Sequence, residues 1–397
     1  MYKYNLVIVN SSWGELDWIL PYILEKNKKS KEKYLCYFKS LNLYQDKKYY
    51  KDLFSICSEA FEDIVHPDKI SIKNFFSVYK YLSIKDIIKI VLSLFTSKSY
   101  YFDYHDSLFM DYLYENNIEI EKVYHELGFM DRYKILEYLD KDVILFPHAQ
   151  TIRGFSFQKD SHNKKNIIKD PFNFEVFKNS RILICDKDER NFWKSVTKID
   201  NYEIVGFPRL QDEWFNYRSK NNIDKTTDKN SILLLIGKYN YIGLGELKII
   251  AKNIFQFAVS KSIKVIVKPH PRNINNFSFF KYLDSFDALY EISSNSVFYE
   301  SKRSILAIST SKSGACLDAV YNNCPVLEYF RYGNKKNRFL EFEVDGKLTS
   351  IYNYYGIVKN VYHNDYLDYL TKIYENKTFR NKLVKSQKSN LMRYLDN

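Results

Sequence analysis

A histidine between two prolines follows a short apolar run, in the segment Lys268-Pro269-His270-Pro271-Arg272. Proline on both sides restricts the backbone, so the turn must project the His270 side chain from the end of the run. Lys268, His270 and Arg272 together present positive charge, which stabilises the charge that develops on a departing phosphate, and an imidazole can also give a proton. The pattern predicts a phosphate-binding, catalytic histidine, with a structural histidine in a turn as the alternative.

A hydroxyl-rich turn, Ser309-Thr310-Ser311-Lys312-Ser313-Gly314, lies between another apolar run and a helical pattern. Free amides at a helix N-terminus and the helix dipole favour a phosphate. The hydroxyls of Ser309, Ser311 and Ser313 can add hydrogen bonds. We therefore assign these serines and Gly314 to the same phosphate site, with simple helix capping as the alternative.

Two further segments offer groups for proton transfer. Glu126 ends an apolar run and is followed by Leu127-Gly128. Its carboxylate can deprotonate an acceptor hydroxyl or attack a sugar carbon; the alternative is a structural glutamate paired with Arg132 or Lys134. His148 also follows an apolar run, and we expect it to act as a base or to orient an acceptor, unless it is a solvent-facing structural histidine.

Several other polar residues are weaker candidates. Glu15 and Asp17 follow the first apolar run and are rivals of Glu126, although Asp17 also suits the first turn of a helix. Trp13 or Trp18 can stack on a sugar ring. The segment Asp186-Lys187-Asp188 looks like a metal-binding Asp-x-Asp, but such short matches are common, and we expect no metal site and no cofactor.

Short apolar runs alternate with helical patterns, which predicts an α/β protein with parallel sheets. The predicted strands are Leu6–Val9, Lys33–Phe38, Tyr100–Asp103, Glu121–His125, Val143–Phe146, Arg181–Cys185, Glu203–Val205, Ser231–Ile236, Lys264–Val267, Ala288–Ile292, Leu306–Ile308 and Pro325–Glu328. Helices are predicted over Gly245–Ser260 and Ala315–Tyr321. Since ligands of open α/β sheets bind at the carboxyl ends of the strands, the residues just after each run matter most.

The polar stretch Arg218–Lys229 lacks apolar periodicity and predicts a linker, with a domain boundary near residue 225. We expect an N-terminal, acceptor-side Rossmann-like domain over 1–225 and a nucleotide-sugar-binding Rossmann-like domain over 226–365. A helical segment over 366–397 is expected to pack back on the first domain. The two Rossmann-like domains are expected to face each other across a cleft.

The composition narrows the class of protein. The formal net charge is +12 over 397 residues, but RRM, KH and zinc-finger signatures are absent, so we expect no nucleic-acid partner. The five cysteines are widely spaced and include no C-x-x-C, which favours a reducing cytoplasm. The first apolar run is too short for a signal peptide, and Ile84–Phe95 is too short and too charged to span a bilayer. Any membrane contact is expected to be peripheral, through the basic segment Lys372–Arg393.

Three segments in order, Glu126-Leu127-Gly128-Phe129, Lys268-Pro269-His270-Pro271 and Ser309–Ala315, resemble motifs of bacterial capsule and lipopolysaccharide transferases of the GT-B type. That group includes capsular Kdo transferases, sialyl- and polysialyltransferases and, more distantly, teichoic-acid glycerophosphotransferases. The chain departs from the pattern where His125 precedes Glu126 in place of a second acid, and where Asp318 stands near the helix position that is usually Glu.

The resemblance implies a metal-independent glycosyltransferase of surface polysaccharide synthesis. Glu126 would be the acceptor-side base, while His270 and the 309–313 hydroxyls would hold the phosphate of a CMP-activated acidic sugar such as Kdo or sialic acid. The acceptor would be an oligosaccharide or a lipid-linked saccharide. Two alternatives remain: a CDP-glycerol or CDP-ribitol polyol-phosphate transferase, and a non-catalytic nucleotide-binding protein with the same fold.

Overall fold

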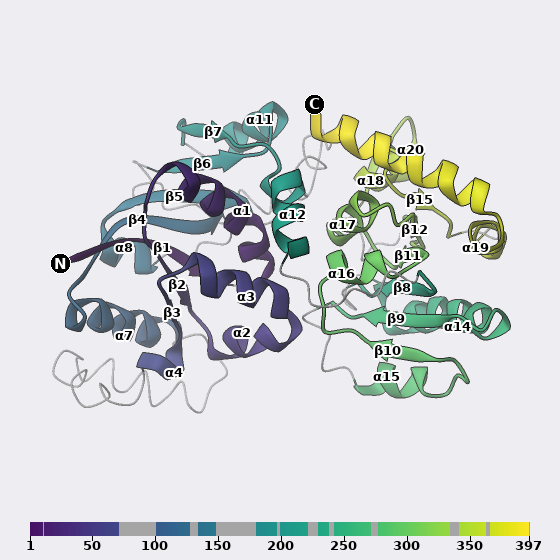
Figure 1. Cartoon of the computed structure of the whole chain (residues 1–397). Coiled ribbons are helices and arrows are strands. Elements are labelled where there is room, and N and C mark those ends of the chain that lie inside the picture. Colours follow the sequence, from purple (N-terminus) through teal and green to yellow (C-terminus); the bar gives the residue numbers. More distant parts are fainter. Residues whose placement is uncertain are drawn as a thin grey trace. The chain divides into compact units, whose positions relative to one another are not determined.

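The computed structural model describes residues 1–10, 12–70, 101–127, 134–147, 180–196, 199–220, 229–237, 242–270, 277–333, 341–362 and 366–396. The chain divides into two compact units, with the main boundary after Arg209 and with Tyr49–Asp52 grouped with the second unit. Each unit is built on one parallel β-sheet with helices on its faces (Figure 1). The predicted α/β class with two parallel-sheet domains is therefore confirmed.

The first sheet has seven strands in the order β3-β2-β1-β4-β5-β6-β7, and every pairing in it is parallel. Its strands are β1 (Tyr2–Val9), β2 (Tyr34–Phe38), β3 (Asp63–Val65), β4 (Ile118–Leu127), β5 (Asp142–Pro147), β6 (Arg181–Ile184) and β7 (Tyr202–Ile204). The central strands are apolar and buried, as expected for a parallel sheet covered on both faces. β1 and β4 are adjacent, so Asn10, just after β1, and Glu126, near the end of β4, lie at one edge of the sheet.

Helices cover both faces of this sheet. They are α1 (Gly14–Lys29), α2 (Leu41–Gln45), α3 (Lys51–Ala60), α4 (Pro67–Ile70), α7 (Tyr101–Glu115), α8 (Lys134–Leu139) and α11 (Lys187–Val196). Trp13, just before α1, packs on Phe38, whereas Phe109 of α7 stacks on Tyr37. Because successive strand residues point to opposite faces, these contacts assign the start of α1 and α7 to opposite sides of the sheet.

The second sheet has six strands in the order β10-β9-β8-β11-β12-β15, again all parallel. They are β8 (Ser231–Leu235), β9 (Lys264–Lys268), β10 (Tyr290–Ile292), β11 (Leu306–Ser309), β12 (Val326–Glu328) and β15 (Lys359–Asn360). A separate antiparallel pair joins β13 (Phe342–Val344) to β14 (Lys347–Thr349). β8 lies between β9 and β11, which bear the two predicted phosphate-binding turns.

The second unit also has eight described α-helices. They are α12 (Asp212–Lys220), α14 (Leu244–Ser260), α15 (Phe277–Leu283), α16 (Val297–Lys302), α17 (Ala315–Tyr321), α18 (Ile351–Tyr354), α19 (Tyr366–Glu375) and α20 (Lys377–Asp396). α20 is tied to the sheet by Gln387, whose side-chain amide donates to the carbonyl of Val326 and accepts from its N–H.

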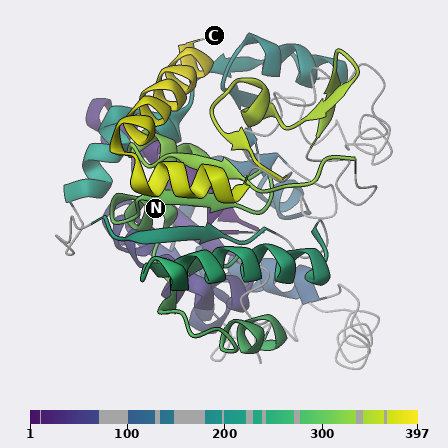
Figure 2. The ribbon, with the colours of Figure 1, turned by 90° about the vertical axis from the view of Figure 1, so that its right-hand side faces the viewer.

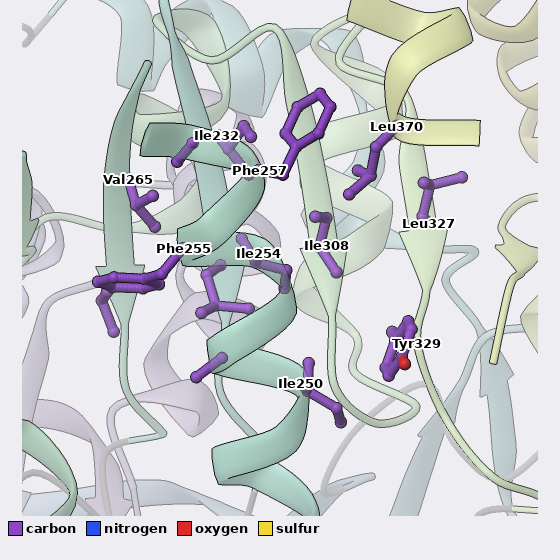
Figure 3. Close-up of a cluster of buried hydrophobic side chains, with 14 of the residues drawn as sticks. Ile232, Ile250, Ile254, Phe255, Phe257, Val265, Ile308, Leu327, Tyr329 and Leu370 are labelled. Atoms are coloured by element: carbon purple, nitrogen blue, oxygen red, sulfur yellow. The ribbon is translucent and has the colours of Figure 1, made fainter. Parts of the chain in front are cut away.

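The core of the second unit lies under α14. Ile250, Ile254 and Ala258 recur at helical spacing and are buried, so one stripe of the helix faces the sheet. This stripe packs on alternate strand residues such as Val265 and Ile308 (Figure 3). α19 adds its buried side chains to the same cluster, and Figure 2 shows α14 and α19 on one face of the sheet.

Eleven of the predicted strands are confirmed, with ends that move by no more than a few residues. The strand predicted over Tyr100–Asp103 is wrong, because residues from Tyr101 onward begin α7. Aromatic residues favour strands locally, but the buried Leu108, Phe109 and Leu113 follow the longer period of a helix.

The start of the predicted linker is also helical, since α12 continues to Lys220, while 221–228 lie outside the described residues. α12 groups with the second unit, and the predicted boundary near residue 225 stays a prediction. The short strands β3, β13, β14 and β15 are absent from the predicted set. In the part of the chain that the structure describes, no helix is long and apolar enough to cross a bilayer.

Candidate functional site

The turns after β9 and β11 begin at the same edge of the second sheet. The N–H of Ile236, just past β8, donates to the carbonyl of Lys268 at 2.9 Å. On the other side, the N–H of Thr310 donates to the carbonyl of Leu235 at 3.0 Å. With one strand between them, the two turns start about 10 Å apart, or two strand spacings. The fold therefore brings the His270 turn and the serine-rich turn to neighbouring positions.

The ends of β8 and β11 approach each other unusually closely. The N–H of Gly237 donates to Oγ1 of Thr310 at 2.8 Å, and that hydroxyl donates in turn to the carbonyl of Leu235. A Cβ atom on Gly237 would lie 2.1 Å from Oγ of Ser311, well inside any normal contact. The approach therefore requires a residue without a side chain at this position.

The serine-rich turn presents a row of backbone N–H groups. Those of Ser311, Lys312, Ser313 and Gly314 have no hydrogen-bond partner among the described residues. The chain then enters α17, where Cys316 N–H already donates to the Ser313 carbonyl. Successive N–H groups that are left unpaired in a turn form an anion-binding concavity. We call residues 311–314 the amide turn.

Lys312 places a cation within the amide turn. Its ammonium group lies 5.8 Å from the ring centre of Tyr352, and the side chain is partly buried. Burial lowers the pKa of Lys312 to about 8, an effect that the carboxylate of Glu328 opposes. The side chain is thus mostly protonated at pH 7 and can add positive charge to the unpaired amides.

The serine hydroxyls of this turn were expected to bind phosphate, but two of them make hydrogen bonds within the chain. Ser309 is buried, and its hydroxyl donates to the carbonyl of Ser311 at 2.5 Å. Oγ of Ser313 accepts from the N–H of Ala315 at 3.3 Å, which is a capping contact. Two of the three hydroxyls are therefore engaged within the chain, and their assignment to a phosphate stays a prediction.

The residues of the histidine turn are described in part. Lys268 ends β9 and is partly buried, and burial lowers the pKa of Lys268 to about 8. His270 follows it at the sheet edge and is also partly buried. Arg272 lies outside the described residues. The catalytic role assigned to His270 stays a prediction.

At the edge of the first sheet, Glu126 is buried near the end of β4, and its carbonyl accepts from Nδ1 of His125 at 2.7 Å. With that ring nitrogen donating, Nε2 of His125 accepts from the side-chain amide of Asn10 at 2.7 Å. β1 and β4 are thereby linked beside the predicted base. His148 lies outside the described residues, and the roles of both residues stay predictions.

The weaker acidic candidates have structural partners. The Glu15 carboxylate accepts from the N–H groups of Asn10 and Ser12, so it fixes the turn between β1 and α1. Asp17 forms a 2.9 Å ion pair with Arg209. Both carboxylates therefore have structural contacts within the first unit.

The Asp-x-Asp segment begins a helix. Oδ1 of Asp186 accepts from the N–H of Glu189, whose carboxylate accepts in turn from the N–H of Cys185. Asp186 thus caps the helix, and Glu189 reaches back to the N–H one residue before the cap, in a variant of the capping box. Burial raises the pKa of Glu189 to about 7. The described ranges contain no group of three or more His, Cys, Asp or Glu side chains that could hold a metal ion.

Three residues of the second-sheet edge were not assigned from the sequence: Gly237, Lys312 and Glu328. Gly237 follows a fully buried strand, and a glycine at that position is a local signal of close backbone approach. Lys312 lies within the quoted serine-rich turn and has a charge suited to phosphate. Glu328 ends a buried strand, where a carboxylate is unexpected.

No protein-family model and no curated protein matches the chain. Solved structures do match it over nearly its whole length. MnaA of S. aureus, solved with UDP, has a TM-score of 0.55 and 13% identity and covers 99% of this chain and 95% of its own. The UDP-GlcNAc 2-epimerase of Neisseria meningitidis, bound to UDP-GlcNAc, has a TM-score of 0.51 and 12% identity and covers 100% and 99%. The fold is of the GT-B type.

The two parallel-sheet units described above agree with this fold type. This agreement confirms the fold that the resemblance implied. It leaves the donor, the acceptor and the reaction open, because at these identities the likeness concerns the fold alone.

Proposed function

We propose that the chain is a nucleotide-sugar-dependent glycosyltransferase that holds the donor phosphate on its second unit. The observation that supports this most directly is the amide turn, four consecutive N–H groups without a partner among the described residues, with the Lys312 cation among them. Such a set of donors suits a phosphate.

Catalysis would follow from charge placement. As the bond between sugar and phosphate breaks, negative charge grows on the phosphate oxygens, and preorganised donors stabilise that charge. The amide turn and Lys312 would supply these donors from one side. His270, two strand spacings away, would donate a hydrogen bond or a proton to the same group. Glu126 would remove the proton of the acceptor hydroxyl.

At the finer level, we propose a CMP-activated acidic sugar as donor and a saccharide of a surface polysaccharide as acceptor. The basis is the ordered set of motifs at Glu126, Lys268–Pro271 and Ser309–Ala315. A polyol-phosphate transferase with a CDP-linked substrate would use the same donors. Peripheral contact with an anionic inner-membrane surface through α20 remains part of this proposal.

The structural likeness supports a second candidate. MnaA of S. aureus was solved with UDP, and the Neisseria meningitidis enzyme is a UDP-GlcNAc 2-epimerase bound to UDP-GlcNAc. An epimerase of a UDP-linked sugar would also need a phosphate site on the second unit. The two candidates differ in the nucleotide and in the product.

Isothermal titration calorimetry separates the candidates at the level of binding. The probes are CMP, CDP, UDP, CMP-N-acetylneuraminic acid, CMP-Kdo and UDP-GlcNAc. We expect binding of cytidine nucleotides under the first proposal and of uridine nucleotides under the second. Absence of heat with every probe would contradict both and favour a non-catalytic protein. Product analysis by mass spectrometry then distinguishes a glycoside from a phosphodiester or an epimerised nucleotide sugar.

Lys312→Met tests the site itself. Because a charge-assisted hydrogen bond contributes about 1.5–3 kcal/mol, we expect nucleotide affinity to fall by roughly 10- to 100-fold. The matched control is Lys347→Met, which removes an exposed lysine from β14 of the same unit. Equal affinities for the Lys312 variant and the unmodified chain would rule out phosphate binding at the amide turn.

A further inference from the structure

Glu328 is a buried carboxylate next to the amide turn. It ends β12, and the strand register pairs it with Ser309 on β11, two residues before the turn. Adjacent strands are about 4.8 Å apart, so its backbone lies one strand spacing from that of Ser309. Only 1% of its surface is exposed. A carboxylate this close to a predicted phosphate site would repel the ligand whenever it is ionised.

Among the described residues, only one of the two carboxylate oxygens of Glu328 has a hydrogen-bond partner. Oε2 accepts from the hydroxyl of Ser350 at 2.6 Å and, at a longer 3.5 Å, from the hydroxyl of Tyr332. Oε1 is buried and has no hydrogen-bond partner within the described part of the chain. Buried carboxylates that remain ionised are normally bonded at both oxygens. The hydrogen bond to Oε2 therefore positions the side chain, but the surroundings do not stabilise the ionised carboxylate fully.

The charged and titratable groups around Glu328 come from three elements. Lys312 belongs to the amide turn, and Cys316 belongs to α17. Tyr332 comes from the chain after β12. Lys312 is the one cation of this set. Its charge is shared between Glu328 and any anion in the turn, so the ionisation of Glu328 and the occupancy of the turn must influence each other.

We propose that Glu328 takes up a proton when a nucleotide-linked phosphate occupies the amide turn, so that a neutral carboxyl group replaces a repulsive carboxylate. This inference rests on the proposed function, because it needs a phosphate at this turn. The step is a protonation by solvent: one O–H bond forms on Glu328, and no covalent bond of the ligand changes. Once Glu328 is neutral, it no longer attracts the Lys312 ammonium group, which can then interact with the phosphate.

Glu328 and Lys312 both titrate near neutral pH, so their protonation can be followed by experiment. Burial raises the pKa of Glu328 to about 7, although the Ser350 hydroxyl and Lys312 act in the opposite direction. At pH 7, about half of the unliganded molecules therefore bear an ionised Glu328. Lys312, with a pKa of about 8, is about nine-tenths protonated at the same pH and has little further proton to gain.

Proton uptake can be measured by calorimetry in two buffers of different ionisation enthalpy. CMP-N-acetylneuraminic acid and UDP-GlcNAc are both titrated, because their phosphates do not themselves take up a proton near pH 7. We expect uptake of about half a proton per bound nucleotide sugar at pH 7, falling toward zero at pH 5.5, where Glu328 is already protonated. Binding without proton uptake overturns this inference alone, whereas absence of binding overturns the proposed function as well.

Variants identify the group that takes up the proton. Glu328→Gln should bind with less than about a tenth of a proton at pH 7, with an affinity at pH 8 several-fold above that of the unmodified chain. The matched control is Glu189→Gln, which removes a buried carboxyl of the first unit whose pKa is also about 7. Glu189 makes hydrogen bonds with Cys185, Asp186 and Trp193. Uptake that persists in the Glu328 variant, or is lost in the Glu189 variant, overturns the assignment.

Ser350→Ala provides an independent variant should Glu328→Gln fold poorly. Removal of the hydroxyl that stabilises the ionised form should raise the pKa of Glu328 further. The pH at which uptake is half-maximal should then move upward, and uptake at pH 7 should decrease. A profile identical to that of the unmodified chain contradicts the proposed role of Glu328.

Discussion

At the residue scale, the edge of the second sheet contains a few groups whose fixed positions suit them to phosphate binding. Lys312 and the unpaired amides supply positive potential. His270 lies two residues after the end of β9, which the hydrogen bond between Ile236 and Lys268 holds in place. None of these groups is a strong catalyst by itself. Their value for phosphate chemistry would come from being fixed before the substrate arrives, because no reorganisation is then needed as charge develops.

His270→Ala tests the catalytic assignment directly. Loss of one preorganised donor to a developing oxyanion typically costs about 10²–10³ in rate, so we expect transfer to fall by that factor. The readout is kcat with the donor that the calorimetric panel identifies. His66→Ala, which changes a histidine stacked on Tyr44 in the first unit, is the control. Near-normal turnover of His270→Ala would contradict the role.

Glu126→Gln tests the predicted base in the first unit. The amide keeps the shape of the side chain but cannot accept a proton, so kcat should fall strongly while nucleotide affinity changes little. Both quantities are measured, by product formation and by calorimetry. Because Glu126 is buried beside the Asn10–His125 contact, an equal fall in affinity would indicate damage to the fold instead.

At the element scale, the site depends on how closely β8 and β11 approach at their carboxyl ends. The register of these strands is fixed by four paired residues from Leu306 to Ser309. Gly237 then allows the chain after β8 to pass against Ser311. The strands thus determine the height of the amide turn above the sheet, and the glycine determines how near the neighbouring loop can come.

Gly237→Ala should disturb both the position of the amide turn and the approach of the loop that follows β8. Its Cβ would lie 2.1 Å from Oγ and 2.9 Å from Cβ of Ser311, so Ser311 or the backbone beside it must shift. Overpacking of this kind costs about 1–3 kcal/mol of stability, and the shift should also weaken nucleotide binding. Urea denaturation and calorimetry measure the two effects. Gly245→Ala, where a Cβ meets open space, is the control. Unchanged binding and stability for Gly237→Ala would show that the approach is not required.

At the scale of the whole molecule, each unit contains a buried carboxyl with a raised pKa. Burial raises the pKa of Glu189 in the first unit and of Glu328 in the second to about 7, from an ordinary value of 4.5. Between pH 4.5 and pH 7, these two carboxyl groups keep their protons in the folded chain but have lost them in the unfolded chain. Their contribution to the free energy of unfolding therefore falls as pH rises. Each group contributes up to about 3 kcal/mol to this dependence.

We therefore expect the urea midpoint to be higher at pH 5.5 than at pH 7.5. Glu189→Gln and Glu328→Gln should each flatten the profile, and the double variant should remove most of the slope. Glu375→Gln, which changes an exposed carboxylate of α19, serves as the control. A midpoint that rises from pH 5.5 to pH 7.5, unchanged by either buried substitution, would contradict the assignment.

The sequence by itself determined the sheets and the turns that follow their strands. Buried parallel strands are continuous apolar runs such as Val265–Val267, and that pattern is local, so it can be recognised without knowing the neighbours. Where a local signal was ambiguous, as in the aromatic residues that begin α7, tertiary burial decided for a helix. The order of the runs also indicated two parallel-sheet units.

Only the tertiary structure decided which groups at those turns are unpaired, buried or close together. The unpaired amides of residues 311–314, the contact of Gly237 with Ser311, and the single bonded oxygen of Glu328 all depend on residues distant in sequence. Hydrogen-bond satisfaction and desolvation are properties of the surroundings, and no spacing of residues along the chain records them.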